Sequence, residues 1–262
     1  MFVIRMQQIP SGASGLDTML KGGLPSKRCT LICGGPGSGK TILSMQFLWY
    51  GASQLDEPGV YVSLDENTAH LREELKGFGW KVEELEKKGK LAIIDASPIR
   101  CLPGEVKLGN AWIGKRNFSM LSLIEVLKNR VNEIKAKRVV VDPIIALILQ
   151  YTSDSERRTA IMDLIEFLNG SGLTSLITTE LRQVSLQRGV RIEEFLSNGV
   201  ILLHTLFNNK EVARGIQIEK MRGINHDYQI HPYKITQNGI EVYAEERSFI
   251  TFNNNPVSKP SY

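Results

Sequence analysis

The sequence predicts an α/β protein with a mostly parallel sheet, helices on both faces of that sheet and a C-terminal antiparallel extension. Short β-branched runs alternate with longer amphipathic stretches as far as Gly199, and only strand-like runs follow it. Strand–helix alternation places successive strands parallel in one sheet, which the connecting helices cover. Strands joined by short turns pair antiparallel instead. The change at Gly199 therefore predicts where the antiparallel extension begins.

Five short apolar runs are expected to form the parallel strands, because strands buried on both faces are rich in valine, isoleucine and leucine. They span residues 28–33, 59–64, 91–95, 138–142 and 173–178. Between them, apolar side chains recur three and four residues apart, which is typical of helices that pack one face on a sheet. These stretches span residues 41–53, 67–76, 119–135 and 157–169. Gly170 and Gly172 are expected to end the last helix.

The C-terminal part is expected to add hairpins to the sheet. Its strand-like runs span residues 200–203, 213–221, 233–236 and 240–243. Asn208-Asn209 and Asn238-Gly239 separate two pairs of these runs, and such dipeptides are typical of tight turns. We expect a single domain over residues 1–243, followed by a polar tail over residues 244–262.

Composition excludes several classes of protein. Of the 262 residues, 42% are hydrophobic and 23% are charged, which excludes a disordered or fibrous chain. Lys and Arg number 32 and Asp and Glu number 28, and the net charge of +4 is too small to indicate a nucleic-acid binder. No apolar run approaches the roughly 20 residues that cross a bilayer, so no membrane partner is expected. Three cysteines without a CxxC motif (Cys29, Cys33 and Cys101) favour reduced thiols in a cytoplasmic protein.

One motif carries specific chemistry. Residues 34–41 read GGPGSGKT and fit the phosphate-loop pattern G-x-x-x-x-G-K-[ST], with an apolar run before them and an amphipathic stretch after them. Its glycines allow backbone N–H groups to converge on phosphates, and the following helix adds its positive dipole end. Lys40 is expected to reach the β- and γ-phosphates, and the Thr41 hydroxyl to ligate Mg²⁺. The residues expected to bind the nucleotide here are Gly34, Gly35, Pro36, Gly37, Ser38, Gly39, Lys40, Thr41 and Ile42.

Carboxylates at the ends of neighbouring strands are candidates for the rest of the site. Asp142 ends a valine-rich strand and is expected to help hold Mg²⁺, with Asp95 as a rival that more often would cap a helix. Asp65 and Glu66 follow the strand after the phosphate loop. Either carboxylate can polarise a water for attack on the γ-phosphate, with Lys40 assisting. Alternatively, Asp65 or Asn67 caps the helix that follows.

A longer series of motifs resembles the KaiC-like branch of the RecA superfamily of ATPases, in its single-domain archaeal form. The series covers roughly residues 7–243, in the same order as in that family. It comprises residues 9–17, 22–25, 34–41, 60–66, 77–80, 94–98, 138–142, 178–180, 193–195 and 219–223 with His226. The resemblance implies a RecA-like P-loop NTPase fold. It also implies an ATPase that forms a homo-oligomeric ring, commonly a hexamer, with ATP and Mg²⁺ between subunits.

The resemblance also implies site residues outside the phosphate loop. In such proteins, the segment matching Lys220, Met221, Arg222 and His226 reaches the ATP of the next subunit, and Thr236 falls where a further nucleotide contact is made. Lys220 and Arg222 would neutralise charge on the γ-phosphate, as an arginine finger does. Without the resemblance, these two residues would be interpreted as the exposed face of an edge strand.

The chain departs from the family pattern at several positions. Asp65 stands where the first of two glutamates is usual, so water activation is expected to be slower or to pass to Glu66. Pro143 follows Asp142 where a hydroxyl residue is usual. Glu194 and Phe195 occupy the positions of the clock protein's phosphorylated Ser-Thr pair, so autophosphorylation there is excluded and a circadian role is not indicated.

Two other functions stay open. One is a recombinase-like protein that binds single-stranded DNA, because RecA-type recombinases hold DNA with loops after the fourth and fifth strands. The basic and aromatic residues there and in the 104–118 insertion are Arg157, Arg158, Arg182, Arg188, Arg191, Lys107, Lys115, Arg116, Trp112 and Phe118. Interleaved acidic residues favour a solvated face instead. The other alternative is a nucleotide-gated scaffold with negligible turnover.

Overall fold

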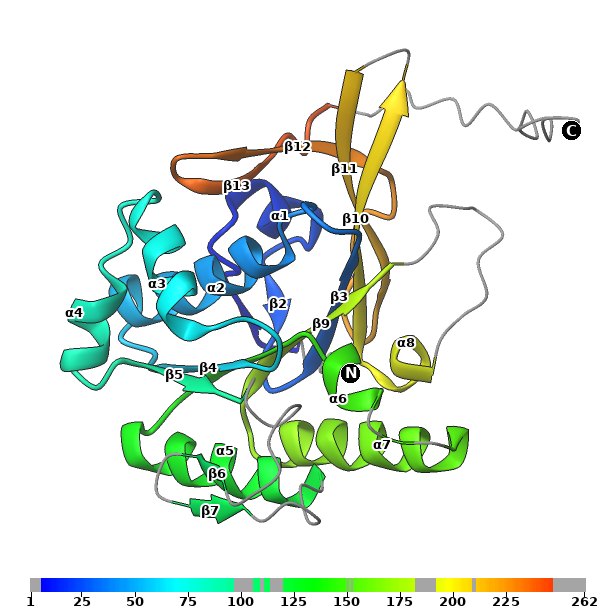
Figure 1. Ribbon diagram of the computed structural model, residues 1–262. Helices are drawn as coiled ribbons and strands as arrows, with labels where there is room; N and C mark the ends of the chain where they lie inside the picture. Colours follow the sequence, from blue (N-terminus) through cyan, green and yellow to red (C-terminus); the bar gives the residue numbers. More distant parts are fainter. Residues whose placement is uncertain are drawn as a thin grey trace, which may run out of the picture.

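A nine-stranded sheet organises the chain (Figure 1). The computed structural model describes residues 6–96, 106–108, 111–113, 120–149, 151, 153–181, 192–208 and 211–246. The strands lie in the order β13-β12-β11-β10-β3-β9-β8-β4-β5. From β10 to β5, neighbouring strands run parallel, and the three strands from β11 to β13 pair antiparallel. The α/β class with a C-terminal antiparallel extension is therefore confirmed.

The parallel strands match the apolar runs of the sequence within two residues. They are β3 (Cys29–Gly34), β4 (Gly59–Ser63), β5 (Leu91–Asp95), β8 (Arg138–Asp142) and β9 (Thr174–Glu180). Nearly every residue in them is buried, because helices cover both faces of the sheet. The start of β10 (Gly199–Asn208) was expected in the antiparallel extension, but it is the sixth parallel strand, because residues 199–203 pair parallel with β3. The antiparallel pairing begins between β10 and β11.

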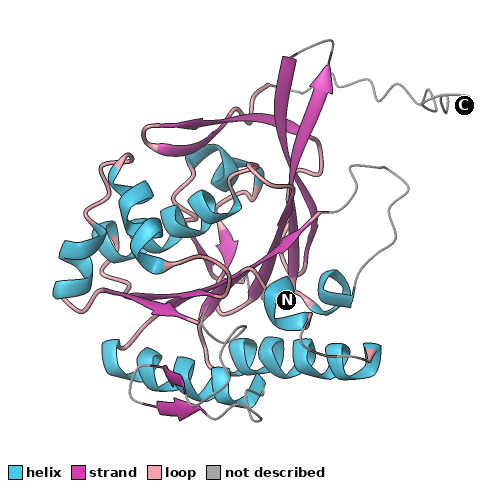
Figure 2. Cartoon of the chain, viewed as in Figure 1, coloured by secondary structure: helices cyan, strands magenta, loops and turns pink. Residues whose placement is uncertain are grey.

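Helices lie on both faces of the sheet, as Figure 2 shows. One face carries α1 (Ser14–Met19), α2 (Lys40–Gln54), α3 (Thr68–Lys76) and α4 (Val82–Lys87). The other carries α5 (Met120–Ile134), α6 (Ile145–Ile148) and α7 (Asp154–Gly170). Two separate clusters of buried side chains, one on each face, form the core.

Local capping explains where two of these helices begin. Ser153 precedes α7, and its hydroxyl accepts a hydrogen bond from the backbone N–H of Glu156, whose side chain bonds back to the N–H of Ser153. Asn67 precedes α3 and accepts a bond from the N–H of Ala69 at 2.8 Å. Of the two capping candidates for α3, Asn67 is therefore the residue that caps, and Asp65 is not.

Short elements that the sequence analysis did not predict complete the fold. They are the β1 (Gln8–Ile9) and β2 (Leu24–Pro25) pair, the β6 (Val106–Leu108) and β7 (Ala111–Ile113) pair, and the helices α1, α4, α6 and α8 (Ile192–Leu196). Each spans six residues or fewer, which is too short for a periodic pattern to identify.

The C-terminal hairpins return to the phosphate loop. After β11 (Glu211–Met221), the strands β12 (His231–Thr236) and β13 (Gly239–Val242) form a hairpin over α2. The Tyr233 hydroxyl donates to the carbonyl of Ser38 at 2.6 Å. Gln46 of α2 bonds to both backbone groups of Ile240, accepting from its N–H at 2.7 Å and donating to its carbonyl at 3.3 Å. The β12–β13 hairpin is therefore hydrogen-bonded both to the phosphate loop and to α2.

The remaining sequence predictions have mixed outcomes. Cys29 and Cys33 are buried, as expected for cysteines in the core, and neither is in a disulfide. Within the described residues, none of the helices combines the length and the apolar character that a membrane crossing requires. Cys101 and most of the predicted 244–262 tail lie outside the residues that the structure describes.

Candidate active site

The phosphate loop joins the buried strand β3 to the helix α2. Gly37 and Gly39 have φ angles of 71° and 88°, which residues other than glycine rarely adopt. A Cβ at Gly39 would stand 2.9 Å from Ile240 of the C-terminal hairpin, so this position also lacks room for a side chain. At Gly35 and Gly37, by contrast, a Cβ would meet nothing within 4 Å. The loop is therefore closely packed on its hairpin side and open on the side where a phosphate chain would lie.

The side chain of Lys40 folds back onto the start of the phosphate loop. Its Nζ donates to the carbonyls of Gly34 at 2.9 Å and Gly35 at 3.1 Å. Burial lowers the pKa of Lys40, and the negative charges of Asp142 and Glu180 partly oppose that shift. A bound anion would oppose it further, because opposite charge favours the protonated amine.

Asp142 is the meeting point of three hydroxyl groups. Its Oδ2 accepts from Thr41 at 2.8 Å and from Tyr61 at 2.6 Å, and its Oδ1 accepts from Thr178. Asp142 is 5% exposed. Asp95, the rival candidate, ends β5 at the sheet edge and does not line the pocket that contains Asp142. The structure thus places Asp142 and not Asp95 beside Thr41.

These oxygens fit a magnesium ion bound together with a nucleotide. Hydroxyl and carboxylate oxygens are the donors that Mg²⁺ prefers, and in nucleotide sites one or two protein oxygens act with phosphate oxygens and water. Among the described residues, no group of three or more His, Cys, Asp or Glu side chains could hold a metal ion. The Thr41 hydroxyl and the Asp142 carboxylate therefore fit a metal that enters with phosphates.

A pocket of about 420 Å³ brings these groups together with further carboxylates. It is lined by Lys40, Thr41, Tyr61, Ser63, Asp65, Glu66, Asp142, Pro143 and Glu180. Apart from Tyr61, which lies within β4, these residues follow or end strands at the carboxyl edge of the parallel sheet, where ligands bind in open α/β folds. The volume falls within the range of small-molecule sites.

Asp65 and Glu66 both reach this pocket but in different environments. Asp65 is exposed, whereas Glu66 is half-buried. Ser63 fixes the backbone of Glu66, donating to its carbonyl at 2.6 Å and accepting from its N–H at 3.2 Å. Burial raises the pKa of Glu66, and the neighbouring charges of Glu74 and Asp142 raise it further. A carboxylate with a raised pKa is a better proton acceptor.

Four pocket residues were not predicted from the sequence as site residues, namely Tyr61, Ser63, Pro143 and Glu180. Tyr61 and Ser63 lie on β4, where the apolar run gave no sign of a polar role, and Glu180 ends β9 beside Gly34 of β3. A carboxylate at the end of a buried strand was the available signal for Glu180. That signal had identified Asp142 by the same argument.

The residues assigned by resemblance lie elsewhere in the chain. Lys220 and Met221 end β11, at the strand register of the beginning of β3. The phosphate loop follows the other end of β3, three to four residues beyond this register, or roughly 10–13 Å further along the strand. Lys220 Nζ donates to the carbonyl of Glu194 at 2.6 Å, and Arg222 donates to that of Phe195 at 3.4 Å. Lys220 and Arg222 therefore lie toward the amino ends of the parallel strands, whereas the pocket of the same chain lies at their carboxyl ends.

The other assigned residues do not line the pocket either. The Met221 side chain is 4% exposed and packs in the core. His226 follows β11 and is half-buried, and its Nδ1 makes no hydrogen bond within the described part of the chain. The Thr236 hydroxyl donates to Glu241 at 2.8 Å. The structure of one chain brings together the phosphate loop and the carboxylates, but not the five positions assigned by resemblance.

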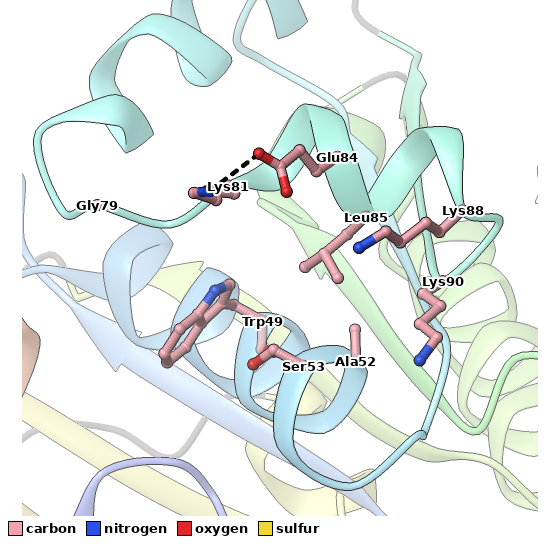
Figure 3. Close-up of a pocket in the computed structure, with 9 residues that line it drawn as sticks. All are labelled: Trp49, Ala52, Ser53, Gly79, Lys81, Glu84, Leu85, Lys88 and Lys90. Atoms are coloured by element: carbon pink, nitrogen blue, oxygen red, sulfur yellow. Dashed lines mark hydrogen bonds and ion pairs between the residues drawn. The ribbon is translucent and has the colours of Figure 1, made fainter.

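A second pocket of about 290 Å³ lies at the far end of α2 (Figure 3). Trp49 and Leu85 form apolar walls, and lysines surround the opening. Lys81 pairs with Glu84 at 3.1 Å and Lys90 with Asp56 at 2.8 Å, all on exposed side chains. No residue of the predicted site lines this pocket.

The predicted DNA-contacting residues lie mostly outside the described residues. Arg182, Arg188, Arg191, Lys115, Arg116 and Phe118 are among them. Arg157 is described and is paired with Asp154 at 3.0 Å, and it donates to the carbonyl of Tyr151. Arg157 therefore already has partners at the start of α7.

Comparisons with known proteins agree with the fold and the loop. A family model for KaiC ATPases matches residues 9–247. The UPF0273 protein of Thermotoga maritima is 36% identical over 241 residues, spanning 92% of this chain and 98% of that protein. A circadian clock oscillator protein KaiC from Prochlorococcus marinus is 34% identical, spanning 92% of this chain and 46% of that protein.

A solved structure agrees with the same assignment. The crystal structure of a KaiC-like protein from Pyrococcus horikoshii superposes with a TM-score of 0.77 at 34% identity, covering 91% of this chain and 99% of that one. The mostly parallel sheet with its antiparallel C-terminal strands is thus a RecA-like fold. Together with the family match over nearly the whole chain, this shows that the protein belongs to the KaiC family of ATPase domains.

Proposed function

We propose that this protein binds and hydrolyses ATP with Mg²⁺ and acts as a homo-oligomeric ring, a hexamer by analogy with its family. One observation carries the catalytic part. Lys40 of the phosphate loop, the Thr41–Asp142 pair and the half-buried Glu66 line a single pocket at the carboxyl edge of the sheet. This is the set of groups that γ-phosphate cleavage requires: phosphate donors, a metal holder and a water-activating base.

Each group has a defined part in this proposal. The amides of residues 34–42 bind the phosphates, and Lys40 exchanges its bonds to the Gly34 and Gly35 carbonyls for phosphate oxygens. Thr41 and Asp142 hold Mg²⁺, which supplies positive charge to the phosphate oxygens when bound. Glu66 accepts the proton of the attacking water, because its partial burial suits it to that role better than the exposed Asp65.

The ring explains residues that cannot act on their own pocket. Lys220 and Arg222 lie at the opposite edge of the sheet from the phosphate loop of the same chain. In a ring with head-to-tail contacts, opposite edges of neighbouring subunits can face each other. Lys220, Met221, Arg222, His226 and Thr236 would then complete the nucleotide site between subunits. Lys220 and Arg222 would stabilise charge on the γ-phosphate.

Calorimetric titration with ATP and Mg²⁺, together with phosphate release, tests the catalytic part. Lys40→Ala is expected to abolish both signals, because it removes the cation at the phosphates. Lys88→Ala is the matched control, since this exposed lysine lies by the second pocket at the other end of α2. Absence of ATP binding by the folded wild-type protein would contradict the proposal. Binding without phosphate release would favour the nucleotide-gated scaffold.

Mixed subunits test the ring. Lys40→Ala and Arg222→Ala proteins are each expected to be inactive, while an equal mixture recovers activity at about one quarter of the interfaces, where an intact loop meets an intact arginine. Native mass spectrometry of the wild-type protein gives the subunit number. No recovery in mixtures that do exchange subunits would show that Arg222 does not act across an interface. Single-stranded DNA stays the alternative partner, since Arg158 is exposed and most of the other predicted DNA-contacting residues lie outside the described residues.

A further inference from the structure

Tyr61 is a buried side chain of the pocket that the proposed function does not use. Only 1% of its surface is exposed, and its hydroxyl donates to Oδ2 of Asp142 at 2.6 Å. A phenylalanine would fill the same space, so packing alone does not call for the hydroxyl. A buried hydroxyl instead has to be matched by an acceptor, and here the acceptor is the carboxylate of the metal site.

The strand register explains how Tyr61 reaches Asp142. Tyr61 of β4 lies opposite Val140 of β8, and Asp142 is two residues further along the same face. Diagonal neighbours on adjacent strands lie within reach of an aromatic side chain, although too far apart for short ones. Ser63, which lies directly opposite Asp142, turns to the backbone of Glu66 instead. The contact therefore depends on a long hydroxyl-bearing residue at position 61.

The hydroxyl groups fix the carboxylate at both oxygens. Thr178 donates to Oδ1, while Thr41 and Tyr61 donate to Oδ2. When the Thr41 proton is directed to Asp142, the lone pairs of its oxygen are available to a cation. The orientation of Asp142 therefore decides how well Thr41 can act as a metal ligand.

We propose that Tyr61 is a positioning residue for the magnesium site, holding the Asp142 carboxylate where Oδ2 receives the Thr41 hydroxyl. The proposal rests on the proposed function, because it assumes that Mg²⁺ enters this pocket with a nucleotide. It predicts that the Tyr61 hydroxyl contributes to Mg²⁺-dependent nucleotide affinity. The affinity for a nucleotide without the metal is expected to depend little on it.

Calorimetric titration of Tyr61→Phe with ADP over a series of Mg²⁺ concentrations tests this inference without relying on turnover. The Mg²⁺ concentration that gives half of the affinity gain is expected to rise about tenfold, as for loss of one hydrogen bond to a charged group. Affinity for ADP in EDTA is expected to change less than about twofold. The control is Tyr151→Phe, whose lost hydroxyl accepts from the Met120 N–H at 3.1 Å and does not contact Asp142.

The outcomes separate the two proposals. If wild-type protein gains no ADP affinity from Mg²⁺, the proposed function fails and the role of Tyr61 fails with it. If the wild type gains affinity and Tyr61→Phe has the same Mg²⁺ midpoint, only the role of Tyr61 is overturned. A lower midpoint would also overturn it, since the hydroxyl would then compete with the metal. A fall in melting temperature with an unchanged midpoint would mark a purely structural role.

Discussion

Replacing Glu66 by glutamine tests the assignment of the water-activating base most directly. The substitution keeps the size of the side chain and removes its capacity to accept a proton. General bases contribute about 10²- to 10⁴-fold to turnover. The half-buried setting of Glu66 and the raised pKa that follows from it favour a full contribution. A loss of about 10³-fold corresponds to about 4 kcal/mol of transition-state stabilisation.

Asp65→Asn is the matched variant, because Asp65 lines the same pocket from the neighbouring position but is exposed. We expect it to lower turnover less than about tenfold. Steady-state phosphate release gives the rate, and calorimetric titration with ATP checks that both variants still bind. Wild-type turnover is also expected to fall as pH drops through the raised pKa of Glu66, because protonation removes the base.

The result that would refute this reasoning is equally specific. If Asp65→Asn slows turnover more than Glu66→Gln, the exposed carboxylate is the base, and burial was the wrong criterion. If the double variant Asp65→Asn/Glu66→Gln turns over ATP at the wild-type rate, neither residue activates the water. Glu180, the remaining carboxylate of the pocket besides Asp142, would then be the candidate.

Two further predictions concern the core. Arg138→Met is expected to lower the free energy of unfolding by about 3 kcal/mol in urea titrations. The reason is that the fully buried guanidinium pairs with Glu57 at 2.6 Å and donates to two backbone carbonyls. A loss below about 1 kcal/mol would mean that this ion pair contributes little. Burial raises the pKa of Cys29 to about 12, so its thiol should not react with a thiol reagent at pH 8 until the protein is unfolded. Peptide mapping of the labelled native protein checks this, and full labelling of Cys29 would contradict it.

Much of the fold could be predicted because its signals are local. The apolar runs that became β3, β4, β5, β8 and β9 identify themselves by composition, and the phosphate loop identifies itself by spacing. The ends of helices were less certain because capping depends on one side chain. Asp65 and Asn67 are equally good capping candidates in sequence, and only the bond from Ala69 N–H to Asn67 distinguishes them.

By itself, the sequence determined the α/β class, the phosphate loop and the candidate carboxylates. Only the tertiary structure decided which of those carboxylates lies beside the phosphate loop. Asp142 and Asp95 both end parallel strands, but β8 lies between β9 and β4, next to the Thr178 and Tyr61 hydroxyls, whereas β5 lies at the edge of the sheet. Strand order is set by pairing between segments far apart in the chain, so no local pattern contains it. For the same reason, the opposite placement of Arg222 and the phosphate loop emerged only from the fold.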